Sequence, residues 1–388
     1  MEDLIYQKKE KIRNINRVYW FISQNKFFTK KEISDSLGIS FPTVTKIINL
    51  LAEKQIIIEK GYSENNTKRK AILYEYNPNS FYSIGIKLEV SSLSFILINL
   101  NGDEIKKTVI VKDFFNDENF VLYIIEELKS FLKGFQFKDL ITGIGISVSG
   151  IVDNKNKILK IGTNFHLFEK DMKEIKNSFQ LPIYLMNEAN AGAIGEFFLN
   201  KTLNSQNIAF ISIESGVGAG IVLDENLYKG HSSKAGEFGH FTVENNGRKC
   251  NCGNSGCLEM YCSNRALIKE FEEKFNLSNL SFVEIFSKGL ADTEKGKEIF
   301  EKYTDYLALG IRNILFLLDL DKVIIGGLIA NYNKYIEKSL KQKVFNNIFF
   351  KEENILEFSK YGDFSNLIGA AFLPFNDLFI NLVTKMAK

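Results

Sequence analysis

The first part of the chain carries apolar residues every three to four positions, a spacing that predicts amphipathic helices and not strands. A first helix is predicted around residues 12–22. A second, short helix is predicted to begin after Thr29, because Glu32 stands at the capping-box position, and to end at Gly38. The chain therefore opens with helices that follow one another closely.

The next predicted helix begins at Ser40, with Pro42 in its first turn, where a missing N–H costs nothing. A short helix, a glycine-containing turn and a second helix form the helix-turn-helix pattern. The outward positions of the second helix are small, hydrogen-bonding or basic, the kinds of side chain that read base edges in the major groove. The residues expected to contact DNA from this helix are Ser40, Phe41, Thr43, Thr45, Lys46 and Asn49.

Two short apolar runs follow these helices and predict a pair of strands joined by a basic tip. The tip residues Lys68, Arg69 and Lys70 are placed to contact phosphates or the minor groove. Helices, strands and tip together predict a winged helix-turn-helix DNA-binding domain over residues 1–78. A helical bundle with an ordinary solvated charge run is the alternative.

From Phe81 onward the apolar positions alternate, which predicts strands. A unit of strand, polar turn, strand, turn and strand occurs over residues 82–111 and again after Asn207, and each copy is followed by a helical stretch. Two similar α/β lobes with a ligand cleft between them are the expected architecture. We predict a first lobe over 79–190, completed by a C-terminal helix at 372–388, and a second lobe over 191–371.

The charge of the chain is unevenly distributed along its length. Residues 1–80 contain 14 Lys/Arg and 9 Asp/Glu, whereas the remaining residues contain 35 and 38. A basic front and a mildly acidic body predict that only the front binds a polyanion such as double-stranded DNA. Neither a secretory signal nor a run of about 18 uncharged apolar residues is present, so we expect a cytoplasmic protein without a membrane span.

The chemistry-bearing residues concentrate in one glycine-rich segment. His240 is followed at short intervals by Cys250, Cys252 and Cys257, which gives one imidazole and three thiolates. Such a set suits a tetrahedral Zn²⁺ ion with no open position for metal catalysis. Reduced cysteines in a flexible loop are the alternative. We predict a structural zinc site.

The segment Ala235–His240, followed by Cys250–Glu259, resembles the signature of the ROK family, which comprises sugar-responsive bacterial repressors and sugar kinases. The resemblance covers nearly the whole chain and includes Gly145–Gly150, Asn187–Asn190 and Gly216–Gly220. It implies a duplicated, actin-like (hexokinase-type) two-lobed α/β body, in which zinc holds a loop against the sugar site. The Asn-Glu-Ala-Asn form of Asn187–Asn190 is also similar to the xylose-repressor branch of the family.

The resemblance further implies a set of sugar-binding residues. Carboxylates and amides suit this role, because sugar hydroxyls both donate and accept hydrogen bonds. Supporting the zinc loop is an alternative role for the two glutamates next to the metal, and capping a turn is an alternative for Asn164. The implied sugar ligands are Asn164, Asn187, Glu188, Glu237, His240 and Glu259.

The kinases of the family carry Asp-x-Gly-Gly-Thr after the first strand of the body, where glycines let the backbone approach the phosphates of ATP. This chain has Lys87 in place of the aspartate, and Glu89 and Val90 in place of the glycines. Glu214 replaces a usual glycine in the second phosphate loop. Glu188 stands where the kinases have their aspartate base, and its extra methylene would misplace it. We therefore expect no enzymatic activity.

These observations predict a sugar-sensing, DNA-binding transcriptional regulator, a repressor of a carbohydrate-utilisation operon such as one for xylose, released by a monosaccharide. One helix-turn-helix makes too few base contacts for operator affinity, so a homodimer or a dimer of dimers is expected. The alternatives are a ROK sugar kinase with an appended DNA-binding head, an activator with the same sensor, and a regulator whose effector is a partner protein.

Overall fold

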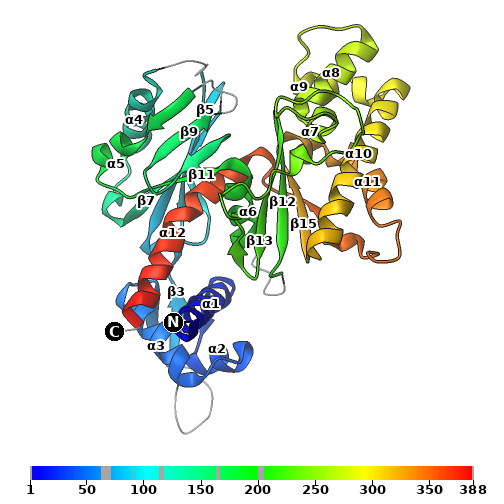
Figure 1. Ribbon diagram of the computed structural model, residues 1–388. Coiled ribbons are helices and arrows are strands. Elements are labelled where there is room, and N and C mark those ends of the chain that lie inside the picture. Colours follow the sequence, from blue (N-terminus) through cyan, green and yellow to red (C-terminus); the bar gives the residue numbers. More distant parts are fainter. Residues whose placement is uncertain are drawn as a thin grey trace. The chain divides into compact units, whose positions relative to one another are not determined.

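The computed structural model describes residues 2–62, 71–89, 91–112, 118–162, 167–199 and 205–386 (Figure 1). Contacts between Cα atoms divide them into two compact units. One unit comprises the described residues of 2–187 and 367–386, and the other those of 188–366. Within the described residues, no helix is both long enough and apolar enough to cross a membrane.

The N-terminal part of the first unit contains three helices and a three-stranded sheet with the order β1-β3-β2. The predicted capping box is present, with the Thr29 side chain accepting from the backbone of Glu32 and the Glu32 carboxylate accepting from that of Thr29. Gly38 ends the second helix in the left-handed conformation, as predicted. The elements are α1 (Glu2–Gln24), β1 (Phe27–Phe28), α2 (Lys30–Leu37), α3 (Phe41–Glu53), β2 (Ile57–Tyr62) and β3 (Ile72–Tyr76).

This N-terminal part is joined to the rest of its unit through the side chain of Tyr19 on α1. The Tyr19 hydroxyl donates to the carbonyl of Leu100, and the hydroxyl of Tyr76 lies 3.5 Å from that of Tyr19. The Tyr19 ring also packs against Phe379 in α12 (Ser365–Met386), with ring centroids 4.6 Å apart. Burial raises the pKa of the Tyr19 hydroxyl, which therefore stays protonated as a donor. Tyr19 thus contacts both the first lobe and the C-terminal helix.

The rest of the first unit is built on a five-stranded sheet with the order β6-β5-β4-β7-β11. Its first three strands are antiparallel, and β7 and β11 add in parallel. A Cβ at Gly145 in β7 would collide with the carbonyl of Ala370, so glycine lets α12 lie directly on this sheet. The strands are β4 (Tyr82–Leu88), β5 (Ser92–Asn99), β6 (Glu104–Val111), β7 (Ile141–Val148) and β11 (Ile183–Asn187); the helices are α4 (Phe120–Phe131) and α5 (Lys173–Phe179); and a small sheet contains β8 (Ile151–Asp153), β9 (Ile158–Gly162) and β10 (Leu167–Asp171).

The second unit repeats this plan with the sheet order β14-β13-β12-β15-β16. Again the first three strands are antiparallel and the last two are parallel. The repeat predicted from the sequence is therefore confirmed. The strands are β12 (Ile208–Ile213), β13 (Val217–Leu223), β14 (Asn226–Leu227), β15 (Lys322–Gly326) and β16 (Leu356–Phe358); the helices are α6 (Glu188–Leu199), α7 (Glu259–Cys262), α8 (Asn264–Phe275), α9 (Phe282–Ser287), α10 (Glu294–Leu318) and α11 (Glu337–Val344).

The chain passes between the two units at the starts of two helices. Asn187 ends β11 in the first unit, and Glu188 begins α6 in the second without an intervening loop. Likewise, α12 begins with Ser365 and Asn366 in the second unit and continues in the first. These crossing points lie a few residues before the limits of 190 and 371 that the sequence predicted, and the predicted domain 1–78 shares a unit with the first lobe.

Candidate functional site

Four metal-binding side chains of the second unit come together in the structure. The ligand atoms of His240, Cys250, Cys252 and Cys257 all lie within 4.8 Å of one another. The sulfurs of Cys252 and Cys257 are 3.6 Å apart, and the sulfur of Cys250 is 3.7 Å from Nδ1 of His240. The residues that the sequence grouped by spacing are therefore neighbours in space.

The geometry of this cluster fits a tetrahedral zinc site. Zn–S bonds of about 2.3 Å place two thiolates at the corners of a tetrahedron about 3.8 Å apart. The observed separation of 3.6 Å between the Cys252 and Cys257 sulfurs is close to that edge. Three sulfurs and one ring nitrogen are donors that zinc prefers and that Mg²⁺ and Ca²⁺ do not. The residues present therefore fit a structural zinc ion.

The segment that carries His240 is held on strand β13 by close backbone contact. The N–H of Ala219 donates to the carbonyl of Gly236 at 2.8 Å. Gly236 has a φ of +86°, and a Cβ there would collide with the carbonyl of Ala219. Only glycine meets both demands without strain. This glycine explains why the signature segment can bring His240 so close to the sheet.

Two carboxylates flank His240, one on each ring nitrogen. Nε2 of His240 is 3.7 Å from a carboxylate oxygen of Glu237, and Nδ1 is 3.8 Å from one of Glu259. The thiol of Cys250 donates to the same Glu259 oxygen at 3.0 Å. The Glu237 side chain is 60% exposed, whereas that of Glu259 is 13% exposed. Glu237 is thus open to a ligand from solvent, while Glu259 also touches the metal cluster.

The thiols of the cluster differ in their electrostatic surroundings. Burial raises the pKa values of the Cys250 and Cys257 thiols, and the nearby Glu259 carboxylate raises both further. A backbone hydrogen bond from Asn254 lowers the pKa of Cys252. Without a cation, these surroundings oppose the accumulation of three thiolates beside a carboxylate. A divalent metal ion supplies the positive charge that such a set needs.

The other predicted sugar ligands are divided between the two units. Asn187 ends β11, and its side-chain amide donates to the carbonyl of Gly150 at 3.1 Å. Glu188 is the first residue of α6. Asn164 lies outside the described residues. The structure therefore brings together Glu237, His240 and Glu259, and gives Asn187 and Glu188 places at a strand end and a helix start.

The position of the first phosphate loop of the kinases is occupied by an ion pair. The ammonium group of Lys87 is 2.9 Å from a carboxylate oxygen of Glu89. The Lys87 side chain is buried, and the other oxygen of Glu89 accepts from the Ser92 hydroxyl at 2.7 Å. Side chains that hold each other in a tight turn between β4 and β5 replace the bare backbone that would bind a phosphate. Val90 lies outside the described residues.

A carboxylate also stands in the second loop, at the end of strand β12. Glu214 is buried, and a carboxylate oxygen lies 3.5 Å from the side-chain amide of Asn264 at the start of α8. A phosphate placed beside this buried carboxylate would meet a charge of its own sign. Both loops therefore disfavour a triphosphate.

The predicted DNA-contacting residues of α3 differ in their exposure. Ser40, Phe41, Lys46 and Asn49 are exposed, and Thr43 is half-buried. The side chain of Asn49 accepts from Lys30 of α2 at 3.1 Å. The Thr45 hydroxyl is buried and makes no hydrogen bond within the described part of the chain, because this position lies at the flank of the apolar face of α3. The wing residues Lys68, Arg69 and Lys70 lie outside the described residues.

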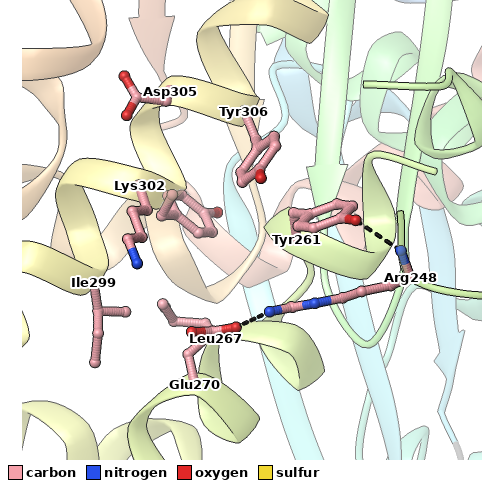
Figure 2. Close-up of a pocket in the computed structure, with 9 residues that line it drawn as sticks. Arg248, Tyr261, Leu267, Glu270, Ile299, Lys302, Asp305 and Tyr306 are labelled. Carbon is pink, nitrogen blue, oxygen red and sulfur yellow. Dashed lines mark hydrogen bonds and ion pairs between the residues drawn. The ribbon is translucent and has the colours of Figure 1, made fainter. Parts of the chain in front are cut away.

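The sequence did not indicate how the metal segment is held against the helices. The N–H of Arg248 donates to the Tyr261 hydroxyl at 2.8 Å, and its guanidinium donates to the Met260 carbonyl at 2.9 Å. The guanidinium also pairs with Glu270 of α8 (Figure 2). The sequence offered one signal for these contacts, an arginine between two predicted metal ligands. Its partners Tyr261, Met260 and Glu270 could not be predicted, because the fold brings them to it.

Comparison with known proteins matches nearly the whole chain. A family model described as the ROK family matches residues 83–376. The xylose repressor of Bacillus subtilis (strain 168) is 28% identical over 375 residues, which cover 94% of each chain. An N-acetylmannosamine kinase of Vibrio cholerae is 33% identical over 219 residues, which cover 56% of this chain and 74% of the kinase. The match to the repressor thus extends over a larger part of this chain than the match to the kinase.

Solved structures show the same fold. The crystal structure of a ROK family transcriptional regulator, a homolog of the E. coli Mlc protein, has a TM-score of 0.79 at 23% identity and covers 97% of this chain and 98% of its own. A ROK family glucokinase from Streptomyces griseus, in complex with glucose and AMPPNP, has a TM-score of 0.66 at 22% identity. That match covers 75% of this chain and 98% of the kinase. The actin-like, hexokinase-type fold is therefore confirmed.

Proposed function

This chain belongs to the ROK family, and from that premise we propose that it is a transcriptional repressor that binds DNA and responds to a sugar. The observation that carries the proposal is the extent of the match to the xylose repressor, which covers 94% of both chains. A match of this length extends beyond the two α/β lobes into the N-terminal helices and strands. The order of α2, the turn at Gly38, α3 and the strands β2 and β3 supports the proposal that this part is a winged helix-turn-helix.

The two phosphate loops support a receptor and not a kinase. An ATP phosphate needs backbone N–H groups within reach and no competing carboxylate. Here the Lys87–Glu89 ion pair occupies the position of the first phosphate loop, and the buried Glu214 carboxylate lies in the second. The altered phosphate loops, together with Glu188 in place of the kinase aspartate, support a receptor for a sugar.

The sugar would bind where the exposed carboxylate of Glu237 and the ring of His240 meet. Glu237 and Glu259 are proposed to accept hydrogen bonds from sugar hydroxyls, joined by Glu188, Asn187 and Asn164. With Nδ1 facing the cluster, Nε2 of His240 is free to face the sugar. Xylose is the first sugar to test, because the repressors that this chain resembles are named for it.

The proposed zinc ion would be held by His240, Cys250, Cys252 and Cys257. When bound, it supplies a fixed cross-link between the signature segment and the cysteine loop, and no catalysis. The protein residues position Glu259, whose carboxylate contacts both Cys250 and the ring of His240. The Arg248 contacts to Tyr261, Met260 and Glu270 hold the same loop from its other end.

The link from sugar to DNA is proposed to run through α12. This helix starts in the second unit and reaches Tyr19 of α1 through Phe379. A sugar that binds one arrangement of the units better than another shifts the population of arrangements by that difference in affinity. We propose a cytoplasmic homodimer, because two DNA-binding heads are needed to read two half-sites.

Two measurements on the purified full chain test this function. Duplexes selected from a random pool are expected to bind it, and xylose or another monosaccharide is expected to weaken that binding at least about fivefold, the range of typical coupling. Transfer of phosphate from ATP to a sugar, abolished by Glu188→Gln, would overturn the proposal. Failure to select any duplex would equally exclude a repressor.

A further inference from the structure

The second unit contains a cavity with a volume of about 440 Å³ between helices α7, α8 and α10 (Figure 2). Most of the residues that line it come from these helices, and Arg248 of the metal loop extends along one side to Glu270. Neither of the carboxylates around His240 lines this cavity. The cavity is therefore separate from the proposed sugar and zinc sites, although α7 carries both Glu259 and the cavity residue Tyr261.

One part of the cavity wall is apolar and aromatic. The rings of Tyr261 and Tyr306 are stacked, with centroids 4.3 Å apart and planes 29° from parallel. Leu267 of α8 and Ile299 of α10 are both buried and add aliphatic surface. A wall of this kind favours a ligand with an apolar body about the size of a ring.

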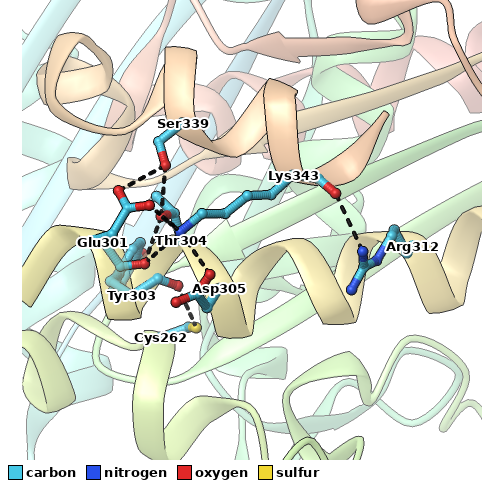
Figure 3. A network of polar contacts seen from close by, with 8 residues as sticks. All are labelled: Cys262, Glu301, Tyr303, Thr304, Asp305, Arg312, Ser339 and Lys343. Carbon is cyan, nitrogen blue, oxygen red and sulfur yellow. Dashed lines mark hydrogen bonds and ion pairs between the residues drawn. The ribbon is translucent and has the colours of Figure 1, made fainter. Parts of the chain in front are cut away.

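Most charged groups around the cavity already have partners. The Arg248 guanidinium is shared among Glu270, the Met260 carbonyl and the face of the Tyr261 ring. Asp305 pairs with Lys343 at 2.7 Å in a neighbouring polar network (Figure 3). Lys302 lies near enough to the Glu298 carboxylate to help lower its pKa, but among the described residues it forms no ion pair as close as these. Lys302 is therefore the positive charge at the cavity that is least tightly paired.

A second donor beside Lys302 lacks a partner. Tyr303 lines the cavity, and its hydroxyl is buried without a hydrogen bond to any described residue. Burial raises the pKa of this hydroxyl, so it remains a neutral donor at physiological pH. A buried hydroxyl without a partner costs free energy, unless a ligand or a water satisfies it.

We propose that this cavity is a second ligand site of the protein and that it takes a small organic monocarboxylate with an apolar, ring-sized body. The carboxylate would pair with the Lys302 ammonium, while the body lies against Tyr261, Leu267 and Ile299. The Tyr303 hydroxyl has almost no accessible surface without a ligand, so a rotation of this side chain on binding would let it donate to the same carboxylate. A doubly charged phosphate would be repelled by Glu270 and Asp305 about twice as strongly as a singly charged carboxylate and is therefore expected to bind more weakly. The proposal does not depend on the sugar or DNA function.

The test is a binding titration of the full chain by calorimetry, with benzoate, phenylacetate and cyclohexanecarboxylate as probes. Benzyl alcohol matches the ring without the charge, and phenyl phosphate replaces the carboxylate by a phosphate. We expect saturable binding of at least one carboxylate, no heat with benzyl alcohol, and weaker binding of phenyl phosphate. Absence of binding by all three carboxylates at millimolar concentration, or tighter binding of the phosphate, would reject the proposal.

Two variants assign the binding to this cavity. Lys302→Gln and Tyr303→Phe are each expected to weaken the carboxylate about tenfold, the usual effect of losing a hydrogen bond to a charged group. Tyr303→Phe keeps the ring and removes only the unpartnered hydroxyl, so its melting temperature should not fall. Lys297→Gln, on the same helix but outside the cavity, is the control and should bind like the parent. If both cavity variants also bind like the parent, the carboxylate occupies another site and the inference is wrong.

Discussion

The buried ammonium group of Lys87 lies 2.9 Å from the carboxylate of Glu89, two residues along the chain at the end of β4. Both residues stand where ROK kinases place the small and acidic residues of their first phosphate loop. The Glu89 carboxylate also accepts a hydrogen bond from the Ser92 hydroxyl, so side chains within the turn hold it together. The polar side chains of this turn satisfy one another, so the turn is stable without a bound phosphate.

The Lys87–Glu89 pair should therefore contribute to stability and not to catalysis. Glu89→Gln removes the ion pair of the buried Lys87 ammonium and should lower the free energy of unfolding by roughly 2 kcal/mol. The double variant Lys87→Met with Glu89→Gln removes both charges and should recover most of that loss. Urea unfolding of the three proteins measures both effects. If the double variant is no more stable than Glu89→Gln, the two side chains do not act as a pair.

Zinc should be bound in a ratio of one ion per chain, and its retention should require the four clustered side chains but not Cys262. Cys257→Ser removes one of four ligands and is expected to lose the ion and to lower the melting temperature. Cys262→Ser is the matched control, because that thiol is buried elsewhere and donates to the Tyr303 carbonyl. Elemental analysis after gel filtration gives the zinc content. Full zinc in Cys257→Ser, or its loss in Cys262→Ser, would contradict the assigned ligand set.

The two carboxylates beside His240 should differ in what they support. Glu237→Gln alters an exposed side chain and should weaken sugar binding about tenfold with zinc retained. Glu259→Gln removes a negative charge that raises the pKa values of the Cys250 and Cys257 thiols, so sugar affinity should fall while zinc retention should be equal or stronger. Calorimetry with xylose and zinc analysis separate the two effects. Glu273→Gln, an exposed change on α8, serves as the control. Unchanged sugar affinity in both variants would remove these residues from the sugar site.

Much of the fold follows from short-range patterns in the sequence. The capping pair Thr29 and Glu32 lies within one helical turn, and the strands of both sheets show in the alternation of apolar positions. The clustering of the four potential metal-binding side chains was also predictable, because three of them lie within eight residues of one another. In each case the residues that determine the feature are close together in the chain.

Features that depend on distant residues were not predictable in this way. The stack of Tyr261 on Tyr306 joins α7 to α10, and no local pattern indicates it. The division between units falls at Asn187 and Glu188, where a strand continues into a helix with no loop to mark it. Thr45 was expected to contact DNA, but its hydroxyl is buried. Helical spacing alone does not determine which flank of the apolar face of α3 is covered by the rest of the fold.

Tyr19 should be needed for the response to sugar more than for the binding of sugar. Tyr19→Phe keeps the ring on Phe379 and removes the hydrogen bond to the Leu100 carbonyl, which contributes about 1 kcal/mol. Xylose affinity should be unchanged, while the effect of xylose on DNA affinity should become smaller. Fluorescence anisotropy on a selected duplex, with and without xylose, measures the difference. Tyr62→Phe, on an exposed tyrosine of β2, controls for the loss of a hydroxyl. A full sugar response in Tyr19→Phe would exclude this route.

Helix α3 and the predicted wing residues should make different contributions to DNA binding. Lys46 is exposed on α3, so Lys46→Ala should weaken binding to the selected duplex more than to unrelated DNA. Arg69→Ala and Lys70→Ala should weaken binding to every duplex and should each reduce the salt slope by about 1, as the loss of one phosphate contact requires. Titrations at several salt concentrations distinguish the two classes, with Lys133→Ala on the first lobe as the control. If Lys46→Ala lowers all affinities equally while the wing variants change the preferred sequence, α3 is not the helix that reads the bases.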